Sequence, residues 1–316
     1  MSDRNRIDVH QHIVPPFWAD ALPAHGGDPS GWSCPAWSVD SALAFMDSVE
    51  IATGVLSLTA PGVKGWHGQE KRDIARKVND YTAEVVAKHP TRFGNFATLP
   101  LPDVDGTLAE IGYAFDSLNV DGVVLMSNYD GVYLGDPVFE PVWAELDRRH
   151  AVAFIHPSMP PIAQMAGMPG PMLDYPFDTT RTAVHLVLNG VVSRYPNVRI
   201  ILSHAGGFLP YAAYRVAQVA PLARNDVPAA DGVLDLLRKF YFDTALSSPS
   251  ALPSLTAFAD PGRILFGSDF PYAPAPISSM FTAEQDASTV LGAAQHAAIN
   301  RDNALPLFPR LAGLNR

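Results

Sequence analysis

Two histidines near the start of the chain have the spacing of a metal-binding pair. His10 and His12 lie in the segment 7–14, where the apolar residues Ile7 and Val9 alternate with polar ones, which is the period of two of a β-strand. Residues two apart on a strand share a face and lie about 6.5–7 Å apart. Both imidazoles can therefore reach one ion through bonds of about 2.0–2.1 Å. The pair alone does not prove a site, because two unrelated histidines give the same pattern.

Three further polar residues come at the ends of later apolar segments. His156 ends the segment 151–156, His204 ends 198–204 and Asp269 ends 264–269. Three imidazoles and one carboxylate suit a divalent ion of the zinc or manganese type, with one position left open. We predict that the ligands are His10, His12, His156 and Asp269. Hydrogen bonding alone at His156, or helix capping by Asp269, are the competing interpretations.

The remaining strand-end histidine suits proton transfer. His204 precedes Gly206 and Gly207, which leave space for a small molecule, and an imidazole titrates near neutral pH. We predict that His204 is a general acid or base; a fifth ligand or a structural histidine are the alternatives. His67 follows the second predicted strand and is a candidate for substrate contact. Residues 120–130 contain no lysine that could bridge two ions, so we expect one metal ion.

These residues need a scaffold that gathers strand ends in one place. Eight short apolar segments are predicted strands, at 7–14, 55–58, 93–99, 120–126, 151–156, 198–204, 240–244 and 264–269. Helices are expected between and after them, at 39–48, 69–89, 105–118, 138–150, 178–194, 209–222, 250–259, 282–296 and 300–309, with Ser38 and Asp178 as N-caps of two of them. Eight such repeats predict an α/β fold, the (β/α)8 TIM barrel, whose chemistry lies at the C-terminal ends of the strands.

We expect a single domain over residues 1–316, with a small insertion after the first strand. Residues 15–48 contain five prolines and three tryptophans, a composition that does not form one long helix. We expect this insertion to fold over the end of the first strand. An open, doubly wound sheet is the alternative, but no Gly-x-Gly-x-x-Gly follows the first strand.

Composition excludes several classes of partner. The formal net charge of −10 disfavours nucleic acid and anionic membranes, both of which need clustered Lys and Arg. The single cysteine, Cys34, excludes an internal disulfide framework and favours a reducing, cytoplasmic location; we expect it to serve packing. We find neither a signal peptide nor an apolar run of 18 residues, so no membrane span is expected.

The chain resembles the amidohydrolase superfamily, and within it the branch of 2-amino-3-carboxymuconate 6-semialdehyde decarboxylase. The resemblance covers nearly the whole chain, and its markers are segments 7–12, 55–61, 92–100, 155–157, 203–210, 267–271 and 303–308. The stretches 30–38 and 59–63 resemble the 6-methylsalicylate-type decarboxylases in particular. No arginine lies between residues 7 and 71, where the muconate enzymes carry one that binds substrate, so a salicylate-like ring is favoured.

The resemblance implies a mononuclear zinc or manganese ion on the four predicted ligands, with His204 as the catalytic histidine. It implies that Arg215 binds a substrate carboxylate, in its own subunit or in a neighbour, and that the protein is a homodimer or homotetramer. The expected reaction is non-oxidative decarboxylation of a small carboxylic acid, with a proton from His204 or Asp269 reaching the carbon that bears the carboxylate. A lactonase or amidohydrolase that uses metal-bound hydroxide, and a non-catalytic barrel, are the alternatives.

Overall fold

Eight parallel strands form the central sheet of the protein, whose computed structural model describes residues 6–312. In order around the sheet they are β1 (Arg6–His12), β2 (Ile51–Ser57), β3 (Phe93–Thr98), β4 (Gly122–Met126), β7 (Val152–His156), β8 (Arg199–Leu202), β9 (Tyr241–Asp243) and β10 (Ile264–Leu265). Nearly all their residues are buried, because helices cover one face and the barrel core the other, which explains the continuous apolar runs. The predicted TIM barrel is confirmed.

The barrel is closed by an irregular segment after β10. The strand predicted at 264–269 keeps regular pairing for two residues only. The chain then follows β1 through single hydrogen bonds, from the Val9 amide to the Phe266 carbonyl at 3.0 Å and from the Asp269 amide to the His10 carbonyl at 2.8 Å. Asp269 has a positive φ of 61°, which is uncommon for a residue other than glycine. The regular ladder therefore ends just before the predicted ligand.

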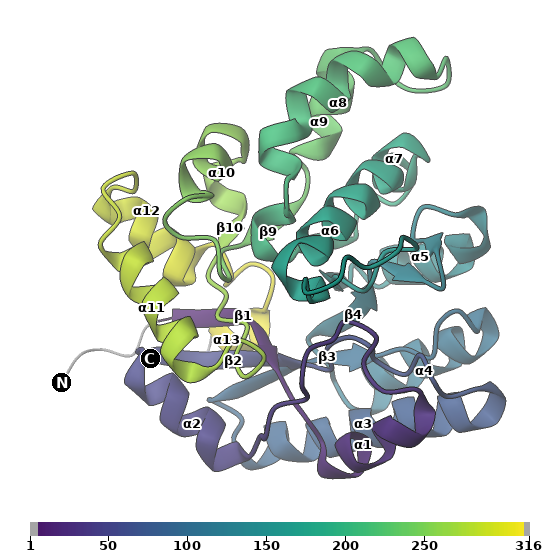
Figure 1. The fold of residues 1–316 in the computed structure, drawn as a ribbon, viewed down its shortest axis with the longest axis vertical. Helices are drawn as coiled ribbons and strands as arrows, with labels where there is room; N and C mark the ends of the chain where they lie inside the picture. The colour runs from purple at the N-terminus through teal and green to yellow at the C-terminus, as the bar shows by residue number, and fades with distance from the viewer. Residues whose placement is uncertain (1–5, 313–316) are drawn as a thin grey trace.

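Helices surround the strands on the outside, as Figure 1 shows. They are α1 (Pro16–Ala21), α2 (Val39–Ser48), α3 (Gly68–Lys88), α4 (Val104–Ser117), α5 (Glu140–Arg148), α6 (Gly170–Leu188), α7 (Val191–Arg194), α8 (Leu209–Ala223), α9 (Ala230–Leu237), α10 (Leu252–Phe258), α11 (Ala275–Asp286), α12 (Ala293–Ala297) and α13 (Pro309–Ala312). The N-cap predicted for α2 is confirmed, since the Ser38 side chain accepts a hydrogen bond from the Ser41 amide.

Three helix predictions were wrong. The helix predicted at 178–194 begins at Gly170 and ends at Leu188, so that Asp178 is inside it and is not its N-cap. The helix begins earlier because Pro171 occupies its first turn, where a missing amide hydrogen costs nothing. The segment predicted at 282–296 is divided between two helices, α11 and α12. The helix predicted at 300–309 is instead the end of a short π-helix, Ala298–Asp302, followed by turns up to α13, and α9 was not predicted.

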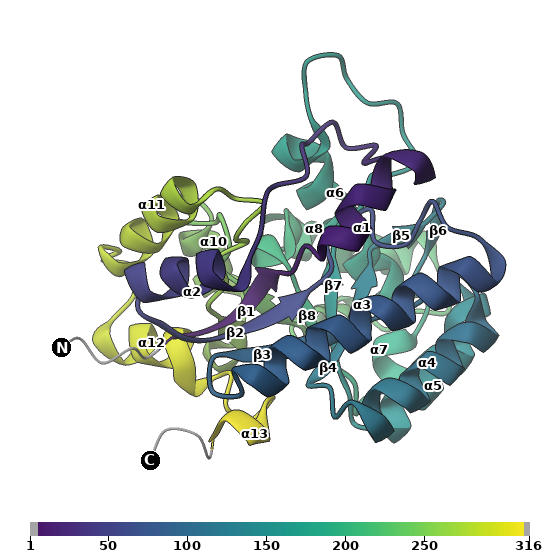
Figure 2. The same cartoon turned by 90° about the horizontal axis from the view of Figure 1, so that it is seen from below.

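The first part of the insertion after β1, up to the loop before α2, lies at the C-terminal end of the barrel, whereas α2 packs on the outside against β2. The insertion contains α1, a loop and α2, and Figure 2 shows the loop before α2 beside the long connection between β7 and α6. The two segments are joined by Ser30, whose carbonyl accepts from the Gly170 amide at 2.8 Å and from Gln164 Nε2 at 3.0 Å. The first part of the insertion and this connection therefore form one cover over the strand ends.

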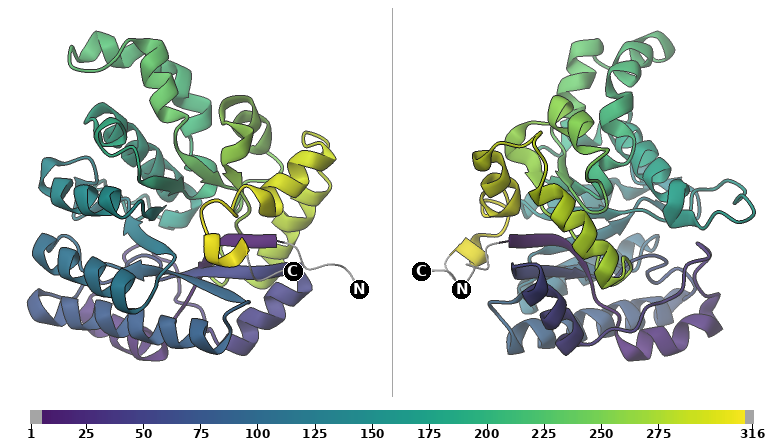
Figure 3. Two further views of the ribbon diagram at one scale, coloured as in Figure 1. Left: turned by 180° about the vertical axis from the view of Figure 1, so that it is seen from behind. Right: turned by 60° about the vertical axis from the view of Figure 1, so that its left-hand side comes forward.

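The opposite end of the barrel is covered by the segment just before α13. Leu307 and Phe308 pack with Ile7 of β1 in the inner core cluster, and Figure 3 shows α13 beside β1 and β2. A second small sheet is the hairpin of β5 (Asn128–Tyr129) and β6 (Val132–Tyr133). No helix within residues 6–312 is both long and apolar enough to cross a membrane.

Candidate metal centre

The four predicted ligands meet at one point of the barrel mouth. One side-chain ligand atom from each of His10, His12, His156 and Asp269 lies within 4.8 Å of every other, and all four residues are buried. His10 Nε2 is 3.1 Å from His12 Nε2, and Asp269 Oδ1 is 3.2 Å from the first and 3.0 Å from the second. The structure therefore brings together residues from β1, from β7 and from the segment after β10.

Hydrogen bonds on the outer side of each imidazole turn its other nitrogen toward this point. His10 Nδ1 donates to Asp243 Oδ2 at 2.8 Å. His12 Nδ1 lies 3.2 Å from the Ser57 carbonyl, and His156 Nδ1 lies 2.8 Å from the Pro157 carbonyl. A ring that donates from Nδ1 keeps the lone pair of Nε2 free for a metal ion. Nε2 of His156 also lies 3.1 Å from Thr59 Oγ1, a contact that an ion bound there would replace. The three imidazoles and one carboxylate oxygen fit a divalent cation.

The pKa shifts of the side chains in the cluster favour the binding of a cation. Burial lowers the pKa of His12 and, with the neighbouring imidazoles, takes that of His156 well below its usual value. Burial opposes charge on His10 too, but Asp243 and Asp269 outweigh it and raise the pKa to about 10. Burial likewise acts against the charge of Asp269, yet His10 and three hydrogen bonds hold its pKa well below the usual range. A proton on His10 thus stands in for part of the charge that a metal ion would supply.

His204 lies beside this cluster in strained backbone. Its Nε2 is 3.4 Å from Asp269 Oδ2, and its amide donates to Asp243 Oδ1 at 2.9 Å. Its φ is 53°, and Ala205 follows with 56°; left-handed residues other than glycine cost about 1–2 kcal/mol each. His204 Nδ1 is buried and has no hydrogen-bond partner. The tight turn therefore presents one imidazole to the mouth with a nitrogen left unused.

The two glycines after His204 allow neighbouring residues to pack closely against the turn. A Cβ on Gly206 would come 2.9 Å from the Phe242 ring, and one on Gly207 would come 2.0 Å from the Pro176 carbonyl oxygen. Only Gly207 lines the large cavity described next. The space expected at Gly206 is thus occupied by an aromatic core residue, and Gly207 permits α6 to approach the turn that carries His204.

A cavity of about 890 Å³ opens above the cluster. His156, His204 and Asp269 reach its floor, and much of its wall is apolar or aromatic, including Trp32, Met172, Tyr175, Phe208 and Tyr272. Trp32 is held by a hydrogen bond of 3.2 Å from its Nε1 to the Tyr272 carbonyl. The insertion and the α6 connection both contribute walls, so the cavity suits a flat apolar ring with one polar end directed at the cluster.

Two predicted substrate contacts lie outside this cavity. His67 is exposed, directly before α3, and Arg215 is exposed on α8; neither belongs to the cavity wall of its own chain. The expectation that Cys34 serves packing was wrong, because the residue is exposed; its sulfur lies 3.9 Å from the Tyr272 hydroxyl.

Two important carboxyl groups were given no role from the sequence. Asp243 orients His10 and anchors the backbone of His204 and Ala245. Asp8 is buried under the cluster, where its side chain accepts from the Ser268 amide at 3.1 Å; burial raises its pKa to about 7, against the hydrogen bonds that lower it. Asp243 ends its strand at the same mouth as the ligands, and this signal could have identified it.

Comparisons with known proteins agree with this geometry. Residues 7–310 match the model of the amidohydrolase family. The decarboxylase YanB of Aspergillus niger is 42% identical over 97% of this chain and 88% of its own length. The 6-methylsalicylic acid decarboxylase AcuB of Aspergillus aculeatus is 42% identical over 97% of this chain and 96% of its own.

One solved structure with a similar fold contains a bound metal ion. A dihydroxybenzoic acid decarboxylase from Polaromonas sp. JS666, with bound manganese and the inhibitor 2-nitroresorcinol, superposes with a TM-score of 0.80. It is 25% identical, over 99% of this chain and 98% of its own. With its barrel, its cluster of three histidines and an aspartate, and a family match over nearly its whole length, the chain belongs to the amidohydrolase family.

Proposed function

We propose that the protein is a metal-dependent, non-oxidative decarboxylase of an aromatic acid such as 6-methylsalicylate. The observation that carries the proposal is the buried cluster of four ligands at the floor of a largely apolar cavity of about 890 Å³. An aromatic acid with an ortho hydroxyl has one polar edge and one apolar body, which match the floor and the wall. Relatives at 42% identity that are decarboxylases support the same reaction class.

The metal ion would be held by His10, His12, His156 and Asp269. We propose zinc, since three imidazoles and one carboxylate suit it; manganese, present in the Polaromonas enzyme, is the alternative. A divalent ion bound there supplies positive charge that binds and orients the carboxylate and ortho hydroxyl of a substrate. The protein supplies the dry aromatic wall that keeps the ring in place.

We assign the proton transfer to His204. Decarboxylation replaces the carbon–carboxylate bond by a carbon–hydrogen bond, so one proton must reach the ring carbon; in the proposed order it arrives first and CO2 then leaves. Asp269 is the alternative donor. Burial acts to raise its pKa, but in the metal-free protein His10 and the hydrogen bonds of Asp269 hold that pKa well below the usual range. His204 borders the cavity and has a free Nδ1. A general acid in this position contributes about 10²–10⁴-fold to a rate.

A role for Arg215 requires a second copy of the chain. It is exposed on α8, near the exposed apolar residues Tyr211, Val219 and Leu222. Tyr211 and Leu222 are 88% and 86% exposed, and such a stripe marks an interaction surface. We propose that α8 joins two copies in a homodimer, which places Arg215 at the interface. A cytoplasmic location remains our prediction.

The test is a CO2-release assay with 6-methylsalicylate and a set of hydroxybenzoates. We expect CO2 and the corresponding phenol from the zinc-loaded or manganese-loaded protein, and none after removal of the metal by a chelator. The His204→Ala variant should keep its metal and lose turnover by about 10²-fold or more. A ring-opened acid or a hydrolysed lactone without CO2 would instead identify a hydrolase.

A further inference from the structure

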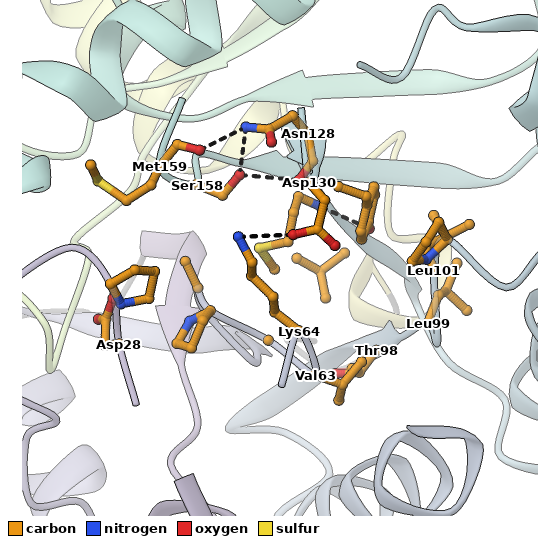
Figure 4. A pocket seen from close by; sticks show the side chains of 18 of the residues that line it. Asp28, Val63, Lys64, Thr98, Leu99, Leu101, Asn128, Asp130, Ser158 and Met159 are labelled. Atoms are coloured by element: carbon orange, nitrogen blue, oxygen red, sulfur yellow. Dashed lines mark hydrogen bonds and ion pairs between the residues drawn. The ribbon is translucent and has the colours of Figure 1, made fainter. Parts of the chain in front are cut away.

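A second, smaller cavity lies beside the large one at the barrel mouth. It has a volume of about 40 Å³ and lies between the ends of β2, β3 and β4, as Figure 4 shows. It shares Asp28, Ala60 and Tyr175 with the large cavity, but none of the four predicted ligands lines it. By the same measure a single water needs about 10–15 Å³, so the cavity holds about three or four non-hydrogen atoms.

A buried lysine with unused donors lines this cavity. Lys71 of α3 is only 7% exposed. Its ammonium makes one long hydrogen bond, 3.4 Å to the Leu101 carbonyl, although an ammonium carries three donors. Within residues 6–312 no carboxylate lies within 4.0 Å of it. Burial lowers the pKa of Lys71, while Asp130 and Asp103 act to raise it. A buried cation without a counter-ion is unfavourable unless something in the cavity compensates it.

A second unpartnered donor lies in the same wall. Thr98, at the end of β3, is 4% exposed, and its Oγ1 has no hydrogen-bond partner. Buried hydroxyls normally find one. The amide of Asn128 is already used, because its Nδ2 donates to Ser158 Oγ at 3.0 Å and its Oδ1 accepts from Gly131. The wall thus offers an ammonium with unused donors and a hydroxyl without a partner.

The carboxyl groups of the wall do not neutralise Lys71. Asp130 pairs with Lys64 at 3.1 Å on the solvent side, where both side chains are about half exposed or more, and Figure 4 shows this pair across the cavity. Asp28 lies on the other wall, beside Tyr175. The pKa of Tyr175 is raised by burial and, second, by the negative charge of Asp28, but Asp28 is not among the groups that shift the pKa of Lys71. Asp130 and Asp103 are near enough to favour the charged form of Lys71. However, Asp130 pairs with Lys64 and Asp103 with Arg72, so among the described residues the donors of Lys71 are left without a carboxylate in direct contact.

We propose that this cavity is a binding site for a small oxyanion of the size of formate, nitrate or bicarbonate, with Lys71 Nζ and Thr98 Oγ1 as its donors. The volume admits a planar group of three or four atoms and excludes an aromatic acid. The site needs no turnover and stands whether or not the proposed decarboxylation is correct. Bicarbonate is of additional interest only under the proposed function, because the CO2 released would give bicarbonate and a proton on reaction with water.

The test is anion binding to the full-length, metal-loaded protein. Sodium formate and sodium nitrate are titrated at constant ionic strength, and the rise in Tm and the heat of binding are measured. We expect saturable binding that Lys71→Met weakens about tenfold or more, because a hydrogen bond to a charged group is lost, and Thr98→Val weakens about two- to tenfold. Lys88→Met is the matched control, because Lys88 is an exposed lysine of the same helix.

The variants also separate this site from the metal centre. An anion that binds at the metal ion should raise the Tm of the wild type and of all three variants by the same amount. A difference in anion affinity between Lys71→Met and Lys88→Met therefore reports binding in the small cavity. Equal responses of these two variants overturn the proposal. If Lys71→Met does not fold, wild-type crystals soaked in sodium nitrate decide: planar density between Lys71 and Thr98 supports the site, and separate water peaks refute it.

Discussion

Replacing Asp243 by Asn should weaken metal binding without removing any ligand. In the wild type the carboxylate accepts from His10 Nδ1 at 2.8 Å, and both side chains are fully buried. Its other oxygen accepts from the amides of His204 and Ala245, each at 2.9 Å. In Asp243→Asn the amide oxygen keeps those two bonds, so the amide NH2 group must face His10. The Nδ1 of His10 then has to accept, and its proton moves to Nε2, which faces the ligand cluster.

The size of this effect follows from its position. Groups that orient a metal-binding histidine contribute about 10–100-fold to metal affinity, or about 1.4–2.7 kcal/mol. We expect the loss of metal affinity in Asp243→Asn to be nearer to about 100-fold than to about 10-fold, because the site is fully buried and water cannot replace the lost hydrogen-bond partner. Competition with a chromogenic chelator measures zinc and manganese affinity. Ser57→Ala is the control and should bind almost normally, since His12 keeps the Ser57 carbonyl at 3.2 Å. Wild-type affinity in a folded Asp243→Asn protein would refute the reasoning.

Three further predictions concern the pH dependence, the turn that carries His204 and the assembly. Metal binding must displace a proton from His10, whose pKa is raised to about 10 in the metal-free protein, so metal affinity should rise with pH up to about 10, with proton release measurable by calorimetry in buffers of different ionisation enthalpy; an affinity independent of pH would contradict this. Gly207→Ala should lower Tm in a thermal melt, because the new Cβ would lie 2.0 Å from the Pro176 carbonyl oxygen; an unchanged Tm would count against the close approach of α6. The double variant Tyr211→Glu and Leu222→Glu should be monomeric in light scattering while the wild type is not, and a wild-type monomer would exclude the proposed interface.

Much of the fold followed from periodicity alone, and the errors have local causes. The buried strands are apolar on both faces, so their positions were evident. Asp178 looked like an N-cap, but it lies inside α6, where its carboxylate accepts from Asn128 Nδ2 at 2.7 Å and from the Tyr133 hydroxyl at 2.5 Å. These partners come from the loop and hairpin after β4, and no local pattern reveals such a long-range contact.

The ligands were predictable because strand ends converge in any barrel of this type. The buried carboxyl groups around the ligands were harder to assign. Asp243 ends its strand at the same mouth as the ligands, but the sequence does not show that it contacts His10, and Asp8 lies inside β1. The placement of His67 and Arg215 outside the cavity depends on the path of loops and on helix rotation, which periodicity does not determine. The Lys71 cavity has no sequence signal at all, because a lysine on an amphipathic helix is normally exposed.

The irregular closure of the barrel also determines when the metal centre can exist during synthesis. His12 and Asp269 are 257 positions apart, and the segment that carries Asp269 is held against β1 by individual hydrogen bonds and not by a regular ladder. A nascent chain that has emerged only as far as β9 has three of the four ligands and an open seam. The complete set of four ligands therefore forms only after the segment beyond β10 has joined β1, and an ion held there would link the first strand to the closing segment of the barrel.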